Sequence, residues 1–475
     1  MSRAGSEVAE LALGVQLASF AGPSLPSEWA ALLREGLAGI CLFGSNLAGS
    51  LDDAAALVRA LRHERPDVLV ATDEEGGDVT RLHVREASPV LGAAVLGAVD
   101  DVTLTRRVGA AVGAELAAVG IDLALGPVAD VNSNPDNPVI GTRSFGAEPA
   151  LAARHVRAWV EGLQSAGVAA CVKHFPGHGD TAQDSHLTVP VVEASAAVLG
   201  ARELVPFRAA VAAGAASVMT SHLLVPAVDP AAPATLSPRV LALLRDDLGY
   251  DGVVVSDALD MAGASHGRGV PEAAVLALAA GCDLLCLGAD KDASLVREVQ
   301  AAIVAAVASG RLPAARLADA ATRVSQLARG VRRGAARCEE GGLELAEMVA
   351  AARLACVVEG ALPDLRDARV VTIATEANIA VGAGRWGLHP EVVVPAGEAL
   401  PSGPLVVQVR DAHRYDDVAA ALAAHAGPLV VVEWGWPGPR TGWESAPHPR
   451  ICTRGNGQPS IAAVSEILGE AGLRR

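Results

Sequence analysis

The segment VAACVKH (168–174) is an apolar run that ends in a lysine and a histidine, with a glycine before it and Phe-Pro-Gly after it. A short apolar run between such breakers is typical of a buried strand. Seven further runs of this kind alternate with helix-like segments rich in Ala, Leu and Arg: GVQLASF (14–20), GICLFG (39–44), DVLVATD (67–73), GIDLALG (120–126), SVMTSH (217–222), GVVVSDA (252–258) and CDLLCLG (282–288). Eight strand–helix units within roughly 330 residues predict an α/β fold, a (β/α)8 TIM-type barrel. A doubly wound sheet is the alternative, but no Gly-x-Gly-x-x-Gly follows the first run.

The composition of the chain changes after residue 330. The run RGVRRGAARCEEGG (329–342) is charged and rich in glycine, and it predicts a linker. A helix is expected over 343–362 and another over 416–426. Four apolar runs predict strands at 369–375, 390–395, 404–410 and 428–434. These segments indicate a barrel over 1–330, a linker over 331–345 and a smaller α/β domain over 346–475.

Composition narrows the possible functions. The net charge of -16 argues against nucleic acid and against an acidic membrane surface as partners, because both would repel this chain. The first thirty residues read poorly as a signal peptide, and no stretch of eighteen uncharged apolar residues stands out. The seven cysteines are scattered and show no paired zinc spacing, so we expect reduced thiols, no metal and a cytoplasmic protein. The oligomeric state is not readable from the sequence.

Polar residues collect at the carboxyl ends of the predicted strands. In a (β/α)8 barrel this end carries the active site. A single polar residue there is more often a strand-end cap or a satisfied core group. The same edge nevertheless receives Asp73, Lys173, His174, His222, Ser256 and Asp257. This coincidence predicts an active site at the barrel mouth.

The run KHFPGHGDTAQDSHLTVP (173–190) is the most polar part of this edge. His174 and His178 have the spacing of two zinc ligands on a helix, but the Phe-Pro-Gly between them forbids a regular helix. A barrel metallohydrolase would be expected to carry a His-x-His pair on an early strand, and none is found there. Asp184 and His186 are two apart, so the carboxylate could hold the imidazole and form a proton-transfer pair. An Asx-turn beside an exposed histidine is the alternative.

Two further residues draw attention by type and position. Only Lys173 and Lys291 are lysines among 38 basic residues, so position 173 favours a compact ammonium over a flat guanidinium. Asp257 directly follows the apolar run VVVS and is expected to project into the barrel mouth. Ser256 or Asp257 could instead cap a helix, and both roles could hold in one loop.

The barrel part of the chain resembles the bacterial β-N-acetylglucosaminidases of glycoside hydrolase family 3. The resemblance covers roughly residues 10–330 and rests on ATDEEGGDVTRL (71–82), GPVADVNSNPDNPVIGTRSFG (126–146), KHFPGHGDTAQDSHLTVP (173–190) and VVVSDALDM (253–261). It implies that Asp257 is the nucleophile and that His186, oriented by Asp184, is the general acid/base. It also implies that the sugar is bound by Asp73, Arg81, Arg143, Lys173 and His174, without a metal or cofactor.

The reaction that this resemblance implies is the exo-acting, retaining release of terminal β-linked N-acetylglucosamine, with muropeptide fragments of the cell wall as substrates. A phosphorylase, in which phosphate replaces water, is an alternative because a histidine catalyst would not repel that anion. A sugar-binding barrel without turnover is a further alternative. The chain departs from the family pattern at Glu74, Asp78 and Thr80, and the two acidic residues add negative charge beside Asp73. These departures leave the preference for the leaving group open.

Overall fold

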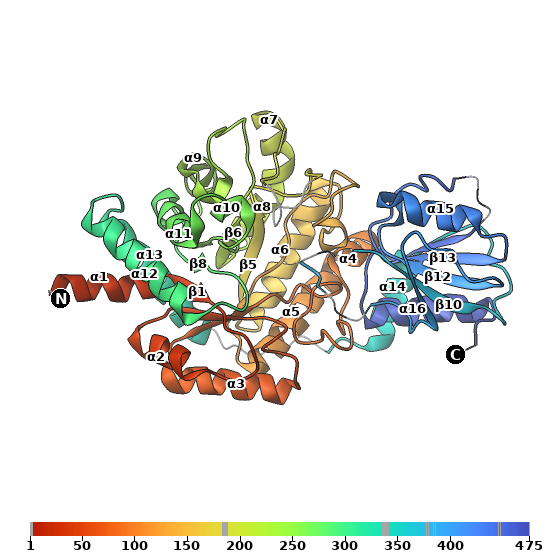
Figure 1. Ribbon diagram of the computed structural model, residues 1–475, viewed down its shortest axis with the longest axis horizontal. Coiled ribbons are helices and arrows are strands. Elements are labelled where there is room, and N and C mark those ends of the chain that lie inside the picture. The colour runs from red at the N-terminus through yellow and green to blue at the C-terminus, as the bar shows by residue number, and fades with distance from the viewer. Residues whose placement is uncertain are drawn as a thin grey trace.

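The chain folds into a barrel and a smaller α/β domain that lie side by side (Figure 1). The computed structural model describes residues 3–182, 189–333, 342–376, 378, 380–382, 384, 386–444, 446 and 448–474. The amino terminus lies on the far side of the barrel, and the carboxyl terminus lies at the smaller domain. Both domains are built around a largely parallel sheet, so each has one edge where the strands end.

Eight parallel strands form the barrel in the order β7-β6-β5-β4-β3-β2-β1-β8. Each of the eight predicted runs overlaps one strand, and the predicted fold class is confirmed. The side chains in these strands are buried, as expected for parallel strands that are covered on both faces. The strands are β1 (Gln16–Ala18), β2 (Gly39–Leu42), β3 (Leu69–Thr72), β4 (Leu123–Ala124), β5 (Ala169–Phe175), β6 (Ser217–Thr220), β7 (Val253–Val255) and β8 (Leu285–Cys286).

The barrel closes between β7 and β8 with the help of side chains. An isolated parallel bridge joins the two strands beyond the regular ladders. The amide of Cys286 donates to Ser256 Oγ at 3.0 Å, and the amide of Val254 donates to Asp283 Oδ2 at 3.0 Å. Two side-chain oxygens therefore take the place of carbonyl acceptors where the circle of strands meets.

Helices cover the outside of the barrel. Their ends follow ordinary capping rules: Ser50 and Asp53 form a capping box at the start of α3, and Gly36 ends α2 at a φ of 116°. The longer helices are α1 (Arg3–Leu13), α2 (Ser27–Glu35), α3 (Leu51–Glu64), α4 (Ala93–Val99), α5 (Val102–Val119), α6 (Pro149–Ser165), α8 (Leu204–Ala212), α11 (Gly269–Ala280), α12 (Ala293–Ala308) and α13 (Ala314–Arg333). Shorter helices are α7 (Ala196–Val198), η2 (Leu199–Glu203), α9 (Pro238–Ala242) and α10 (Ala262–Ser265).

The second domain contains a six-stranded sheet in the order β11-β10-β12-β13-β14-β9. Four of its strands were expected: β10 (Arg369–Ala374), β11 (Val392–Pro395), β12 (Leu405–Val409) and β13 (Leu429–Glu433). The helix predicted over 343–362 is too long, because α14 (Leu345–Ala355) ends before Val357–Glu359, which forms the antiparallel edge strand β9. Adjacent β-branched valines favour a strand at that point. Strand β14 (Arg450–Cys452) was not expected, and α15 (Asp416–Ala424) and α16 (Gln458–Glu470) complete the domain.

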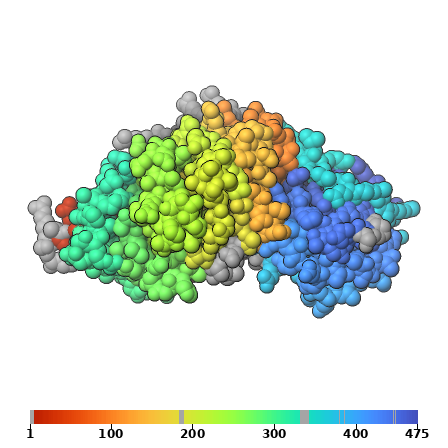
Figure 2. All heavy atoms as spheres, turned by 90° about the horizontal axis from the view of Figure 1, so that it is seen from above, coloured from red at the N-terminus to blue at the C-terminus, as the bar shows by residue number. Residues whose placement is uncertain are grey.

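The two domains are packed together over helix α14 and over the carboxyl ends of both sheets. Helix α14 contacts α4 of the barrel on one side and α16 of the second domain on the other. Figure 2 shows the second domain, in blue, directly against the orange and yellow part of the barrel. Met348 and Val349 of α14 belong to the same apolar cluster as the barrel core. Among the described residues, no helix has the length and hydropathy needed to cross a membrane.

Candidate active site

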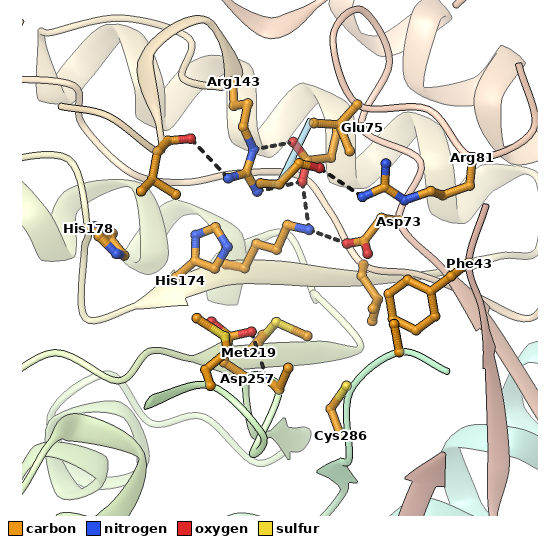
Figure 3. Close-up of a pocket in the computed structure, with 18 of the residues that line it drawn as sticks. Phe43, Asp73, Glu75, Arg81, Arg143, His174, His178, Met219, Asp257 and Cys286 are labelled. Atoms are coloured by element: carbon orange, nitrogen blue, oxygen red, sulfur yellow. Dashed lines mark hydrogen bonds and ion pairs between the residues drawn. The ribbon is translucent and has the colours of Figure 1, made fainter. Parts of the chain in front are cut away.

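A cavity of about 410 Å³ opens at the carboxyl ends of the barrel strands (Figure 3). It brings together six of the residues that the sequence singled out: Asp73, Arg81, Arg143, Lys173, His174 and Asp257. The predicted pair Asp184 and His186 lies outside the described residues, in the segment 183–188. His222 does not line the cavity; its ring is buried, with Nε2 2.9 Å from the carbonyl oxygen of Ala258.

The loop after β3 returns to the cavity through a tight glycine turn. Asp73 leaves the end of β3, and Gly76 and Gly77 follow with φ angles of 77° and 59°. A Cβ atom on Gly77 would lie only 2.4 Å from the Cα atom of Gly92, so a larger residue does not fit there. The turn brings Arg81 back to the cavity that Asp73 also lines. The local backbone geometry thus brings two predicted sugar ligands, which are eight positions apart in the sequence, to the same cavity.

Lys173 is the centre of an ion cluster on one wall of the cavity. Its Nζ atom lies 2.6 Å from Asp73 Oδ1 and 2.6 Å from Glu75 Oε1. Arg143 binds Glu75 with two parallel bonds, Nε to Oε2 at 2.9 Å and Nη2 to Oε1 at 2.8 Å. Figure 3 shows these bonds as one continuous chain from Arg143 to Asp73. A compact ammonium fits between the two carboxylates, which accounts for a lysine at this position.

The cluster keeps its members charged despite their burial. Burial alone would raise the pKa of Glu75, but Arg143 and Lys173 outweigh it and hold that pKa far below its usual range. Burial likewise opposes the charge on Lys173, yet Asp73 and Glu75 raise the pKa of its ammonium above its usual range. A wall of paired charges can exchange hydrogen bonds with the neutral hydroxyl groups of a sugar.

His174 is oriented by a carboxylate that the sequence did not point to. Its Nδ1 atom lies 2.7 Å from Asp130 Oδ2, and the buried Asp130 also accepts the amide of His178 at 2.7 Å. Burial would raise the pKa of Asp130, but His174 outweighs it and the pKa is lowered. The Asp130 bond fixes the ring of His174, which lines the cavity on the side of Asp257 (Figure 3).

His178 also lines the cavity, although the sequence suggested it only as an unsuitable zinc ligand. Its Nδ1 atom lies 2.8 Å from Thr181 Oγ1, and burial lowers the pKa of its ring to about 4. An uncharged imidazole therefore stands beside His174, with the two ring centres 6.2 Å apart. In the described part of the chain no group of three or more His, Cys, Asp or Glu is arranged to hold a metal ion.

Asp257 enters the cavity from the end of β7, on the wall opposite the ion cluster (Figure 3). Its Oδ1 atom accepts the amide of Ala258 at 2.8 Å. The interpretation of Ser256 as a helix cap is wrong, because its hydroxyl oxygen accepts the amide of Cys286 and the next helix, α10, begins at Ala262. Ser256 instead fastens β7 to β8 and so holds the strand from which Asp257 projects.

The departures from the family pattern do not add charge to the cavity. Glu74 turns away from it and accepts the amides of Arg81 at 2.8 Å and Leu82 at 3.1 Å. Burial raises the pKa of Glu74. Asp78 points toward the second domain, where Arg410 Nη2 lies 3.1 Å from its Oδ1 atom. The carboxylate of Glu74 therefore stabilises the loop, and the carboxylate of Asp78 stabilises the domain interface.

Sequence reasoning thus missed Glu75 and Asp130. Glu75 stands two positions after Asp73, a spacing that places both side chains on one side of an extended segment, so a signal was present. Asp130 lies in the loop after β4, and its role depends on contacts with β5. No local sequence pattern identifies Asp130 as a site residue. Ala380 of the second domain also lines the cavity, which no feature of the sequence indicated.

A (β/α)8 barrel that places a carboxylate opposite a set of charged hydroxyl-binding groups is the arrangement of a carbohydrate-processing enzyme. The chain belongs to glycosyl hydrolase family 3, because the model of that family's N-terminal domain matches residues 14–327. The resemblance noted in the sequence is confirmed by this match. Curated bacterial β-hexosaminidases are among the proteins to which the chain is similar.

Two curated relatives illustrate this similarity. β-Hexosaminidase A of Pseudoalteromonas piscicida is 33 % identical over an alignment of 331 positions, and this alignment covers 64 % of this chain and 55 % of that protein. The β-hexosaminidase of Alkalilimnicola ehrlichii is 38 % identical over 289 residues, 58 % of this chain and 80 % of the relative. The chain therefore spans little more than half the length of the first relative and most of the second.

A solved structure matches both domains. It is a family 3 β-N-acetylglucosaminidase from Paenibacillus sp. strain FPU-7, with a TM-score of 0.86 and 31 % sequence identity. The match covers 98 % of this chain and 97 % of the other. The second domain is therefore shared with that protein as well as the barrel.

Proposed function

We propose that this protein is an exo-acting, retaining β-N-acetylglucosaminidase that releases terminal β-linked N-acetylglucosamine. The observation that carries the proposal is the position of Asp257, which lines one cavity together with the five predicted sugar ligands. The family match and the activities of the relatives named above support the same reaction class. The domain boundaries proposed for it remain 1–330, 331–345 and 346–475.

In the proposed mechanism, Asp257 attacks the anomeric carbon and forms a glycosyl-enzyme intermediate. Lys173, Arg143 and Asp73 hold the sugar hydroxyls in the cavity and fix the ring over the nucleophile. His186, oriented by Asp184, first gives a proton to the leaving oxygen and then takes one from water. This last assignment rests on the family resemblance.

The charge pattern of the cavity wall supports a neutral sugar at this position. Lys173 and Arg143 are each paired with carboxylates, and Arg81 donates to the carbonyl oxygen of Ala380 at 2.8 Å. Paired cations bind hydroxyl groups well and attract a free anion weakly. This pattern favours hydrolysis over a reaction with phosphate.

We propose cell-wall muropeptide fragments as the natural substrates and a cytoplasmic setting, both from the family resemblance. The cysteines that the structure describes are free thiols, which supports a reducing compartment. They are Cys41, Cys171, Cys282, Cys286, Cys356 and Cys452.

The test compares two chromogenic substrates. We expect 4-nitrophenyl N-acetyl-β-glucosaminide to be cleaved with retention, and the matching β-glucoside to be cleaved much more slowly. Activity should survive EDTA, because no step of the mechanism uses a metal. Equal rates on both substrates would contradict the proposal. If added phosphate diverted the product to N-acetylglucosamine 1-phosphate, the protein would be a phosphorylase instead.

A further inference from the structure

The loop that joins β3 to the helices has two faces with different surroundings. Asp73, Glu75 and Arg81 line the cavity. Asp78, at the tip of the same loop, lies away from the cavity and faces the second domain. The loop is thus placed between the sugar site and a domain for which the mechanism above has no role.

Asp78 forms a buried contact with the second domain. Its Oδ1 atom lies 3.1 Å from Arg410 Nη2, and the two side chains are only 6 % and 14 % exposed. Its Oδ2 atom accepts the hydroxyl of Thr142 at 2.7 Å and the amide of Asn456 at 3.3 Å. Arg410 is itself held with its guanidinium 4.7 Å from the ring centre of Trp386. A carboxylate buried in this way depends on its cation, because the loss of one partner leaves an uncompensated charge.

The loop is stiff enough to carry a displacement at Asp78 to the cavity. The amide of Glu75 donates to the carbonyl oxygen of Val79 at 3.0 Å and closes the glycine turn. The Glu74 carboxylate accepts the amide of Arg81 and fixes the returning segment to the outgoing one. Gly77 lies close to Gly92 at the start of α4, where an added Cβ atom would come within 2.4 Å of the Gly92 Cα atom, and this close approach limits movement of the turn toward α4. We therefore expect a displacement of Asp78, at the tip of the loop, to move Glu75 and Arg81 together.

A second contact supports the same arrangement from another element. Asn378 Nδ2 donates to the carbonyl oxygens of Pro138 and Val139, each at 2.9 Å. These two residues lie three and two positions before the turn Gly141–Arg143, and Val139 lines the cavity beside Arg143. The second domain thus holds both loops that carry the arginine ligands of the proposed sugar site.

We propose that Arg410 is a positioning residue for the sugar site, acting through Asp78 on the loop that carries Glu75 and Arg81. The inference rests on the proposed function and assigns the second domain a part in substrate affinity. Arg410 itself does not line the cavity, so it acts on the ground-state and transition-state complexes alike through Arg81. The signature of such a role is a change in KM at nearly constant kcat.

The experiment uses the full chain with Arg410→Met, Asp78→Asn and the double variant. With 4-nitrophenyl N-acetyl-β-glucosaminide, each single variant should raise KM about tenfold and leave kcat within about twofold. The double variant should be no worse than either single one, because both remove the same contact. Arg410→Lys should recover part of the affinity. Asp78→Asn keeps the size of the side chain, so it remains informative if Arg410→Met folds poorly.

The matched control is Gln458→Ala. Gln458 Nε2 donates to the carbonyl oxygen of Ala87 at 3.1 Å, an interdomain contact outside the 73–82 loop. This variant should lower the melting temperature without changing KM. A KM that stays constant in Asp78→Asn and Arg410→Met, or that rises equally in Gln458→Ala, would overturn the positioning role.

A readout without substrate separates this inference from the proposed function. Amide hydrogen exchange of the peptide 73–82 should become faster in Arg410→Met and not in Gln458→Ala. A wild-type protein that fails to cleave the substrate would reject the proposed function. Unchanged exchange in this peptide would reject the positioning role, whatever the activity of the wild type.

Discussion

The barrel and the second domain both end their parallel strands in charged residues, and the two edges serve different purposes. In the barrel, Asp73, Lys173 and Asp257 face a cavity of about 410 Å³. In the second domain, Arg410 and Glu433 stand at the corresponding ends of β12 and β13, yet they do not line that cavity. Parallel strands present polar groups at this edge in either case. What covers the edge decides whether it becomes a site or an interface.

Glu433 shows how the second domain satisfies its own strand ends. Its carboxylate accepts the amides of Asp411 at 2.7 Å, Ala412 at 2.9 Å and Gly435 at 2.7 Å. Burial, and then the neighbouring Asp411, raise the pKa of Glu433 to about 7. In the barrel, Lys173 and Asp73 bind each other's side chains on one wall of the cavity, whereas this carboxylate binds backbone. We therefore expect substitutions at the barrel edge to lower activity and substitutions at the edge of the second domain to lower stability.

The largest expected effect tests the barrel edge. Asp257→Ala should lower kcat/KM by about 10⁴-fold or more on every substrate, because Asp257 is the proposed nucleophile that forms the glycosyl-enzyme. The melting temperature should change little, since Asp257 faces the cavity. Steady-state kinetics and a thermal melt of the same preparation measure both. A residual rate within a hundredfold of wild type would remove Asp257 from the role of nucleophile.

The second-largest expected effect tests which domain supplies the proton to the leaving oxygen. His186→Ala should form the intermediate readily from a nitrophenyl glycoside and then stall, because His186 is the residue proposed to activate water in the second step. A burst of nitrophenolate followed by a slow phase, with rescue by azide as the β-glycosyl azide, is the expected result.

Glu433→Gln provides the comparison for that experiment. It should keep kcat on poor leaving groups, since the Glu433 carboxylate is occupied by backbone amides. If Glu433→Gln lost activity and His186→Ala ignored azide, the proton donor would belong to the second domain.

A smaller effect tests the stabilising role of the second edge. Glu433→Ala leaves three backbone amides without their acceptor and should cost about 2–4 kcal/mol of unfolding free energy. The folded fraction should retain the wild-type kcat, because Glu433 does not line the cavity. Chemical denaturation monitored by tryptophan fluorescence gives the first quantity. A loss of activity without a loss of stability would contradict the division between the two edges.

The smallest effect concerns a buried carboxyl group of the barrel that lies outside the cavity. Glu203 bonds Arg202 through Oε1, while its Oε2 atom has no hydrogen-bond partner among the described residues. Burial raises the pKa of Glu203 from 4.5 to about 7. The unfolded chain releases this proton first, so the stability of the folded protein falls as pH rises through that window.

Glu203→Gln removes this titration and should be the more stable protein above neutral pH. The difference should approach about 3 kcal/mol at most and should shrink toward pH 4.5. Melting temperatures of both proteins across pH 4.5 to 8 measure it. Parallel curves would show that Glu203 does not titrate in this range.

The barrel could be predicted from sequence because each strand is a short apolar run whose identity depends on local residues. The order of the strands follows from the fold, so the residues at strand ends, Asp73, Lys173 and Asp257, could be placed at one edge in advance. Strands β9 and β14 were not predicted. β9 directly follows a helix of similar hydropathy, and β14 begins with Arg450 and carries a single aliphatic residue, Ile451.

The contacts between side chains were harder to predict than the edge on which they lie. The pairing of Asp130 with His174 joins the loop after β4 to strand β5, and it depends on how these neighbouring strands pack. The pairing of Asp78 with Arg410 spans 332 positions in sequence and two domains. A departure from a family motif at Asp78 was visible, but its partner could not be chosen among the many arginines without the domain arrangement.

The contact between Arg81 and Ala380 has a consequence for how such a site can diverge. The acceptor is a main-chain oxygen, so every amino acid at position 380 would offer the same atom. Point mutation at this position can alter the bulk of the wall and leaves its hydrogen bond in place. Release of Arg81 from this bond therefore requires a shift of the main chain after β10 or a substitution of Arg81 itself, and a new side chain at position 380 is not enough.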